Sequence, residues 1–131
     1  MTDGDTLKVL DAQKVTHKIR LSGIDAPESK QDFGQRSKAN LSALAFNQQA
    51  TLDCPKVDRY KRKICIVTVD GLDIGLEQIK AGMAWWYRKY AKEQNLHQRV
   101  SYEKAEYKAR KNRIGLWAGN NTIPPWKWRR R

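Results

Sequence analysis

Apolar and polar side chains alternate through the first part of the chain. This period-2 pattern predicts strands over residues 6–10 and 15–24, and it places Val15, Ile19 and Leu21 on one face of the second strand. The short stretch between these strands is typical of a hairpin loop. We therefore expect the two strands to pair as neighbours.

Later segments predict three further strands. They cover residues 50–54, 63–70 and 83–87. The charged loop 56–62 joins the first two of these strands, and the dipeptide Asp70-Gly71 predicts a tight turn after the second.

Helical spacing of apolar positions predicts three helices. They cover residues 34–47, 75–81 and 95–112. Gly82 is placed to end the second helix, and Asn95 with Gln98 resembles a capping pair that opens the third. The third helix has a thin apolar side, which consists of Val100, Ala105 and Ala109.

Short strands with helices packed outside them predict a β-rich α+β fold. The natural candidate is a five-stranded OB-fold barrel with about three flanking helices. A chain of 131 residues fits one such domain, which we expect over residues 1–118. Residues 119–131 form a basic tail rich in Trp, Pro and Arg, and we expect this tail to be extended and poorly anchored.

The charge balance favours a polyanionic partner. The chain carries 26 Lys and Arg residues against 14 Asp and Glu residues, a formal net charge of +12. Nucleic acid or an acidic membrane surface fits this excess, although a merely soluble basic protein is the simpler alternative. No apolar stretch approaches the length needed to span a bilayer, so we expect no membrane-spanning segment.

The two cysteines, Cys54 and Cys65, do not match a zinc-ligand spacing with His17 and His97. We expect the cysteines to face each other across the predicted strand pair, because the charged loop lies midway between them. A disulfide and two buried free thiols both remain open.

Acidic residues flank the first two predicted strands. Asp5 precedes one strand and Asp25 follows the other, so pairing of the strands would bring both carboxylates to one end of the barrel. Two carboxylates with a nearby backbone carbonyl suit Ca²⁺, whereas Mg²⁺ demands stricter geometry. Taken alone, Asp-Gly-Asp at residues 3–5 is a turn signal.

Two arginines could complete a phosphate site at the same end. Arg20 lies five residues before Asp25, and Arg62 closes the charged loop. A guanidinium group pairs bidentately with phosphate oxygens, although any single arginine in so basic a chain could be a solvated surface group. Together with Glu28, these residues could hold a phosphodiester and stabilise a phosphoryl transition state.

Four short motifs carry a family resemblance. DGDT at 3–6, IRLSGIDAPE at 19–28, DRYKR at 58–62 and GLW at 115–117 resemble the staphylococcal (micrococcal, thermonuclease) nuclease family. The resemblance extends from residue 3 to about residue 118. It implies an OB-fold barrel and Ca²⁺-dependent cleavage of DNA and RNA that leaves 5′-hydroxyl and 3′-phosphate ends.

The resemblance also implies roles for single residues. Metal ligands would be Asp5, Asp25 and Ala26, the last through its backbone carbonyl; Arg20 and Arg62 would bind phosphate; Glu28 would activate the attacking water; Tyr87 and Tyr90 would stack on bases. The Trp85–Tyr90 stretch departs from the family pattern.

A non-catalytic OB-fold module that binds nucleic acid is the alternative function. It would need the positive charge but not the paired acids. In either case we expect a monomer whose partners are DNA and RNA. Members of the family normally have a strand before the DGDT motif, so we expect the numbered chain to be truncated. Removal of an N-terminal signal would favour a secreted or periplasmic location.

Overall fold

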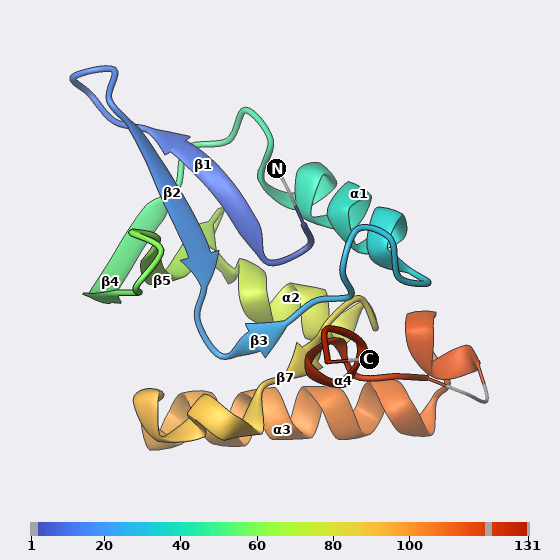
Figure 1. The fold of residues 1–131 in the computed structure, drawn as a ribbon. Coiled ribbons are helices and arrows are strands. Elements are labelled where there is room, and N and C mark those ends of the chain that lie inside the picture. Colours follow the sequence, from blue (N-terminus) through green and yellow to red (C-terminus); the bar gives the residue numbers. More distant parts are fainter. Residues whose placement is uncertain (1–2, 120–121, 131) are drawn as a thin grey trace.

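The computed structural model describes residues 3–119 and 122–130 and has an α+β architecture (Figure 1). The strands are β1 (Thr6–Leu10), β2 (Thr16–Leu21), β3 (Ile24–Asp25), β4 (Thr51–Val57), β5 (Lys63–Val69), β6 (Leu72–Asp73) and β7 (Trp85–Trp86). The helices are α1 (Gly34–Ala45), α2 (Ile74–Lys80), α3 (Leu96–Lys111) and α4 (Pro125–Trp128), with 3₁₀ turns η1 (Arg88–Glu93) and η2 (Gly115–Ala118). Within the described ranges, no helix is long and apolar enough to cross a membrane.

The main sheet is open. Its order is β1-β2-β5-β4 with β6 paired to β5, and a separate ladder joins β3 to β7. Strands β2 and β5 are parallel, whereas β1 with β2 and β4 with β5 are antiparallel. The α+β class is confirmed, but the predicted closed five-stranded barrel is wrong.

A bend after β2 explains this difference. Gly23 adopts φ +80°, a conformation that glycine reaches without steric cost. The bend divides the single strand predicted over 15–24 into β2 and β3, and it directs β3 to pair with β7 instead of extending the main sheet. The strand predicted over 83–87 is correspondingly reduced to Trp85–Trp86.

The core lies between the main sheet and the helices. Its fully buried members include Ile19, Leu21, Leu41, Val67 and Ile79. A second, smaller cluster joins Trp85 with Ala109, Leu116 and Trp117, and Phe33 and Trp126 pack against it. This second cluster brings the C-terminal part of the chain onto the domain.

Helix α3 begins as predicted and buries Ala109 of its predicted apolar side, but Val100 differs. Asn95 and Gln98 form a complete capping box. Val100 is 55% exposed, so its predicted place in the core is wrong. Instead α3 buries Glu106, whose Oε2 accepts a hydrogen bond from the backbone N–H of Trp86 at 2.7 Å.

The expectation of an extended, poorly anchored tail over 119–131 is wrong for residues 122–130; residues 120, 121 and 131 lie outside the described ranges. Residues 125–128 form α4, which packs beside β3 and β7 (dark red in Figure 1). The ring of Trp126 lies 5.3 Å from that of Trp85 and 5.2 Å from that of Tyr87. Aromatic contacts of this kind stabilise the segment. Its many arginines had favoured a fully solvated tail.

Cys54 and Cys65 face each other between β4 and β5 as predicted, and of the two alternatives left open they form the disulfide. The two cysteines lie 11 residues apart in the sequence, and their bond closes the hairpin that carries the charged loop. Cys65 is fully buried, so the crosslink joins the loop directly to the core.

Removing this crosslink should destabilise the protein. A disulfide that closes so short a loop contributes about 3 kcal/mol through the reduced entropy of the unfolded chain. We expect Cys54→Ala with Cys65→Ala to lose about that much free energy of unfolding, measured by urea denaturation. Dithiothreitol should weaken the wild type similarly and leave the double variant unchanged. Equal urea midpoints for reduced and oxidised wild type would contradict the bond.

Candidate active site

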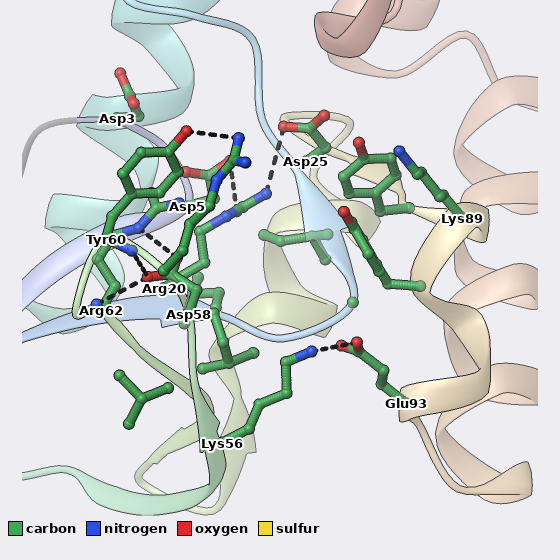
Figure 2. Close-up of a pocket in the computed structure, with 18 of the residues that line it drawn as sticks. Asp3, Asp5, Arg20, Asp25, Lys56, Asp58, Tyr60, Arg62, Lys89 and Glu93 are labelled. Carbon is green, nitrogen blue, oxygen red and sulfur yellow. Dashed lines mark hydrogen bonds and ion pairs between the residues drawn. The ribbon is translucent and has the colours of Figure 1, made fainter.

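Arg20 joins the two acidic residues that the strands bring together (Figure 2). The register of β1 with β2 sets Thr6 opposite Arg20, so Asp5 lies immediately beside the guanidinium group. Nη1 of Arg20 lies 2.8 Å from Oδ2 of Asp5, and Nη2 lies 3.5 Å from Oδ1 of Asp25. Asp5 is 5% exposed and Asp25 is 1% exposed. The predicted convergence of the two carboxylates is therefore what the structure shows.

Local hydrogen bonds fix the orientation of Asp5. Its Oδ1 accepts from the hydroxyl of Thr6 at 3.0 Å, and its Oδ2 accepts from the backbone N–H of Ala26 at 2.8 Å. The backbone N–H of Leu21 donates to the carbonyl of Asp5 at 2.8 Å. The start of β1 is thus tied to the residue that follows β3, and Ala26 lies beside both acids.

Burial and neighbouring charges have opposite effects on the pKa at Asp25 and at Arg20, whereas at Asp3 the nearby acids add to the effect of burial. Burial raises the pKa of Asp25, although the hydrogen bonds from Arg129 and the charge of Arg20 oppose the rise. Burial also raises the pKa of Asp3, and the nearby charges of Asp5 and Glu28 add to it. Burial would lower the pKa of Arg20, but the two carboxylates beside it hold that pKa above its ordinary value. Arg20 therefore keeps its charge while enclosed.

Arg62 is positioned by the loop between β4 and β5. Its Nε donates to Oδ2 of Asp58 at 2.8 Å, and its guanidinium carbon lies 5.5 Å from the centre of the Tyr60 ring. Oδ1 of Asp58 accepts from the backbone N–H groups of Tyr60 and Arg62, both at 2.9 Å. Burial would raise the pKa of Asp58, but these bonds hold it below its ordinary value. Asp58 lies within the DRYKR motif, yet sequence reasoning did not recognise it as the residue that orients Arg62.

One cleft of about 870 Å³ collects nearly all the predicted site residues. It is lined by Asp5, Arg20, Asp25, Glu28, Arg62, Tyr87 and Tyr90. Figure 2 shows Arg20 of β2 and Asp5, which directly precedes β1, on one side of the cleft, whereas Lys89 and Glu93 of η1 lie on the opposite side. An ion pair between Lys56 and Glu93 bridges β4 and η1 along this cleft.

Tyr87 and Tyr90 form an aromatic edge to the cleft. Their ring centres lie 4.9 Å apart at an interplanar angle of 85°. Tyr90 is 40% exposed, so part of its ring is open to solvent. Burial, followed by the charge of Asp25, raises the pKa of Tyr87, so this hydroxyl stays protonated.

Sequence reasoning missed Arg129, which reaches the acids from beyond α4. Its Nη1 and Nη2 donate to the two carboxylate oxygens of Asp25 at 3.1 and 2.8 Å. Nη1 also donates to Oε1 of Glu28 at 2.6 Å. The hydrogen bonds to Asp25 raise the pKa of Arg129, so it remains a cation here. No local pattern signals a contact that spans more than a hundred residues.

The donors in this cleft are suited to a hard cation. Carboxylate oxygens are preferred ligands of Ca²⁺. The guanidinium group of Arg129 already forms ion pairs with both Asp25 and Glu28. In residues 3–119 and 122–130, no three His, Cys, Asp or Glu side chains are arranged as a metal-ligand cluster. A cation here would therefore depend on two carboxylates, a backbone carbonyl and water.

Removing Arg20 should unfold the site. Its loss would remove the cation between Asp5 and Asp25 and leave Asp5 without its ion-pair partner, and breaking a buried ion pair costs about 3–5 kcal/mol. We expect Arg20→Met to lower the free energy of unfolding by that amount in urea denaturation. Lys18→Met changes an exposed residue of the same strand and should shift it by less than about 0.5 kcal/mol. Equal stability of the two variants would show that the ion pair is dispensable.

The chain is similar to known nucleases over nearly its whole length. The family model described as "Staphylococcal nuclease homologue" matches residues 18–119. An "Uncharacterized endonuclease" of Haemophilus influenzae is 42% identical over 130 residues, covering 99% of this chain and 70% of that protein. A "Micrococcal nuclease" of Shigella flexneri is 40% identical over 137 residues, covering 98% of this chain and 76% of that protein. "Staphylococcal-like nuclease CAN1" of Arabidopsis thaliana is 35% identical over 113 residues, covering 86% of this chain and 33% of that protein. These matches confirm the resemblance carried by the sequence motifs, and the chain belongs to the staphylococcal nuclease family.

Proposed function

We propose that this protein is a Ca²⁺-dependent nuclease that hydrolyses DNA and RNA and leaves 5′-hydroxyl and 3′-phosphate ends. The carrying observation is the buried ion-paired group of Asp5, Arg20 and Asp25 at the wall of a cleft that also contains Glu28 and Arg62. A module that only binds nucleic acid needs positive charge, but it gains nothing from like-charged acids held together out of water. Relatives named as nucleases support the same reaction class.

The cation would be held by Asp5, Asp25 and the backbone carbonyl of Ala26, with water completing its shell. These are oxygen donors of the kind that Ca²⁺ accepts in flexible geometry. When bound, the ion would supply positive charge against a phosphate oxygen as negative charge develops there.

Glu28 is the residue proposed to take the proton of the attacking water. The water oxygen forms a bond to phosphorus, and the bond from phosphorus to the 5′ oxygen breaks on the opposite side. The phosphate remains on the 3′ oxygen, and the leaving 5′ oxygen acquires a proton from solvent. Glu28 is suited to this role because it lies in the cleft close to Asp25. The guanidinium group of Arg129 donates hydrogen bonds to both carboxylates.

Arg20 and Arg62 would neutralise the phosphate oxygens that do not react. Arg20 is held by two carboxylates and Arg62 by Asp58 and Tyr60, so both guanidinium groups are oriented before substrate arrives. Such preorganised charge is usually a large contribution to catalysis. The rings of Tyr87 and Tyr90 line the cleft, and they would stack on the bases next to the reacting phosphate.

Cleavage should depend on Ca²⁺ and on Asp25. We expect plasmid DNA and single-stranded RNA to be cut with Ca²⁺, less efficiently with Mg²⁺, and not with a chelator. Asp25→Asn should raise the Ca²⁺ concentration needed for half-maximal cleavage at least tenfold, because it removes a ligand charge. End labelling would identify the products. Retained DNA binding without cleavage under any metal condition would favour the non-catalytic module instead.

Glu28 should affect the chemical step rather than binding. We expect Glu28→Gln to lower the single-turnover rate at saturating Ca²⁺ by about 10² or more, the usual scale for loss of a general base. DNA affinity should stay within a few-fold of the wild type. Glu103→Gln, an exposed change on α3, is the matched control and should cleave normally. A Glu28→Gln rate within a few-fold of the wild type would remove this residue from the mechanism.

A further inference from the structure

Residues 124–130, which we call the cleft arm, cover part of the proposed active site. Pro125 of the arm is buried. Trp126 meets Trp85 edge-on at 76° and stacks on Tyr87 at an interplanar angle of 7°. The arm therefore has a specific aromatic contact on the tyrosine that would otherwise face a nucleobase.

The stacking geometry is the one that a base would use. A parallel ring 5.2 Å from the ring of Tyr87 covers the face on which a planar nucleobase would lie. Tyr90 meets Tyr87 at an interplanar angle of 85°, so Trp126 is the described ring that stacks parallel on Tyr87. Base stacking on Tyr87 in this position requires that Trp126 move away.

Arg129 likewise stands where positive charge is needed. Asp5, Asp25 and Glu28 contribute three negative charges, and Arg20 and Arg129 contribute two positive ones. These five groups keep one net negative charge, and without Arg129 they would keep two. Asp3 adds a further carboxylate beside Asp5 and Glu28, so removal of Arg129 would leave a cluster suited to a cation.

Arg129 also uses the oxygens that the cation and the water would need. Both carboxylate oxygens of Asp25 accept hydrogen bonds from it, and so does Oε1 of Glu28. A dication at the same place would meet a fixed positive charge within a few ångströms of its ligands. The two charges repel strongly in so enclosed a site.

We propose that the cleft arm is an autoinhibitory element of this chain. Trp126 takes the place of a nucleobase on Tyr87, and Arg129 takes the place of the cation on Asp25 and the proton acceptor position on Glu28. Divalent cation and nucleic acid displace the arm, and the arm in turn weakens the binding of both. This inference rests on the proposed nuclease function.

The arm is built so that it can be displaced. Helix α4 has only four residues, and the side chain of Arg129 is 39% exposed. Gln31 connects the loop of Glu28 to Ile123, the residue directly before the arm. Its Nε2 donates to the carbonyl of Ile123 at 2.6 Å, and its Oε1 accepts from the N–H of Glu28 at 3.1 Å. Movement of the arm is thus coupled to the loop that carries the proposed base.

Calorimetric titration of the protein of residues 1–131 with CaCl₂ tests the competition without using activity. If the arm is closed in nine molecules of ten, the apparent affinity for Ca²⁺ is reduced about tenfold, and release of the arm restores it. We expect Arg129→Gln to bind Ca²⁺ at least tenfold more tightly than the wild type. Arg130→Gln removes the same charge from the next residue and should stay within twofold.

A second variant separates release of the arm from loss of charge. Trp126→Leu keeps Arg129 but removes the stack on Tyr87, so it should also tighten Ca²⁺ binding, by at least threefold. In the wild type, Ca²⁺ should accelerate trypsin cleavage after Lys127, because the displaced arm fits the protease active site more readily. Mass spectrometry would measure this cleavage.

The outcomes are distinct. Equal Ca²⁺ affinity in the wild type, Arg129→Gln and Trp126→Leu would overturn the autoinhibitory arm and leave the proposed nuclease intact. If Arg130→Gln also bound Ca²⁺ tenfold more tightly, the effect would come from the net charge of the protein, and the autoinhibitory role of the arm would be overturned as well. Absence of Ca²⁺ binding in every variant would overturn both this inference and the proposed Ca²⁺ dependence.

Discussion

The enclosure of one guanidinium group between two carboxylates constrains the rest of this structure. Arg20 can be buried only because Asp5 and Asp25 lie on either side of it, and the acids can be buried together only because Arg20 separates them. Placing Arg20 between Asp5 and Asp25 requires β1 and β2 to pair in one register and β3 to begin at Ile24. A slip of one residue would turn Arg20 to the other face of the sheet. The charge cluster therefore specifies the strand register as well as forming the wall of the cleft.

The same cluster explains how stability and chemistry share residues. Buried carboxylates repel each other, and a cluster that retains excess negative charge is suited to accept a cation. Arg20 offsets enough of the repulsion to let the fold form, but it leaves charge unbalanced. The residue that balances it further in this structure is Arg129. The active cleft thus has a fixed half, formed by the sheet and the disulfide-linked loop, and a half supplied by a short peripheral segment.

Local patterns in the sequence predicted several features of the fixed half. Alternation gave the β1–β2 pairing, the Asn95 and Gln98 pair marked the start of α3, and flanking acids predicted the meeting of Asp5 with Asp25. Patterns of this kind report the neighbours of a residue in the chain or across one hairpin. They could not reveal that the sheet stays open, because the turn at Gly23 and the pairing of β3 with β7 depend on contacts between distant segments.

The peripheral half was misjudged for a related reason. Three arginines and two prolines near the end of the sequence are typical of a solvated tail. The two tryptophans in the same stretch do not reveal, from composition alone, which residues they will contact. In the folded chain Trp126 gains ring contacts with Trp85 and Tyr87, residues that lie side by side only because β7 and η1 follow one another at the cleft. That anchor carries Arg129 to within hydrogen-bonding distance of Asp25, a carboxylate that needs positive charge. Two weak preferences, aromatic packing and charge neutralisation, thus act on one short segment, and their combination gives it a defined position that neither would give alone.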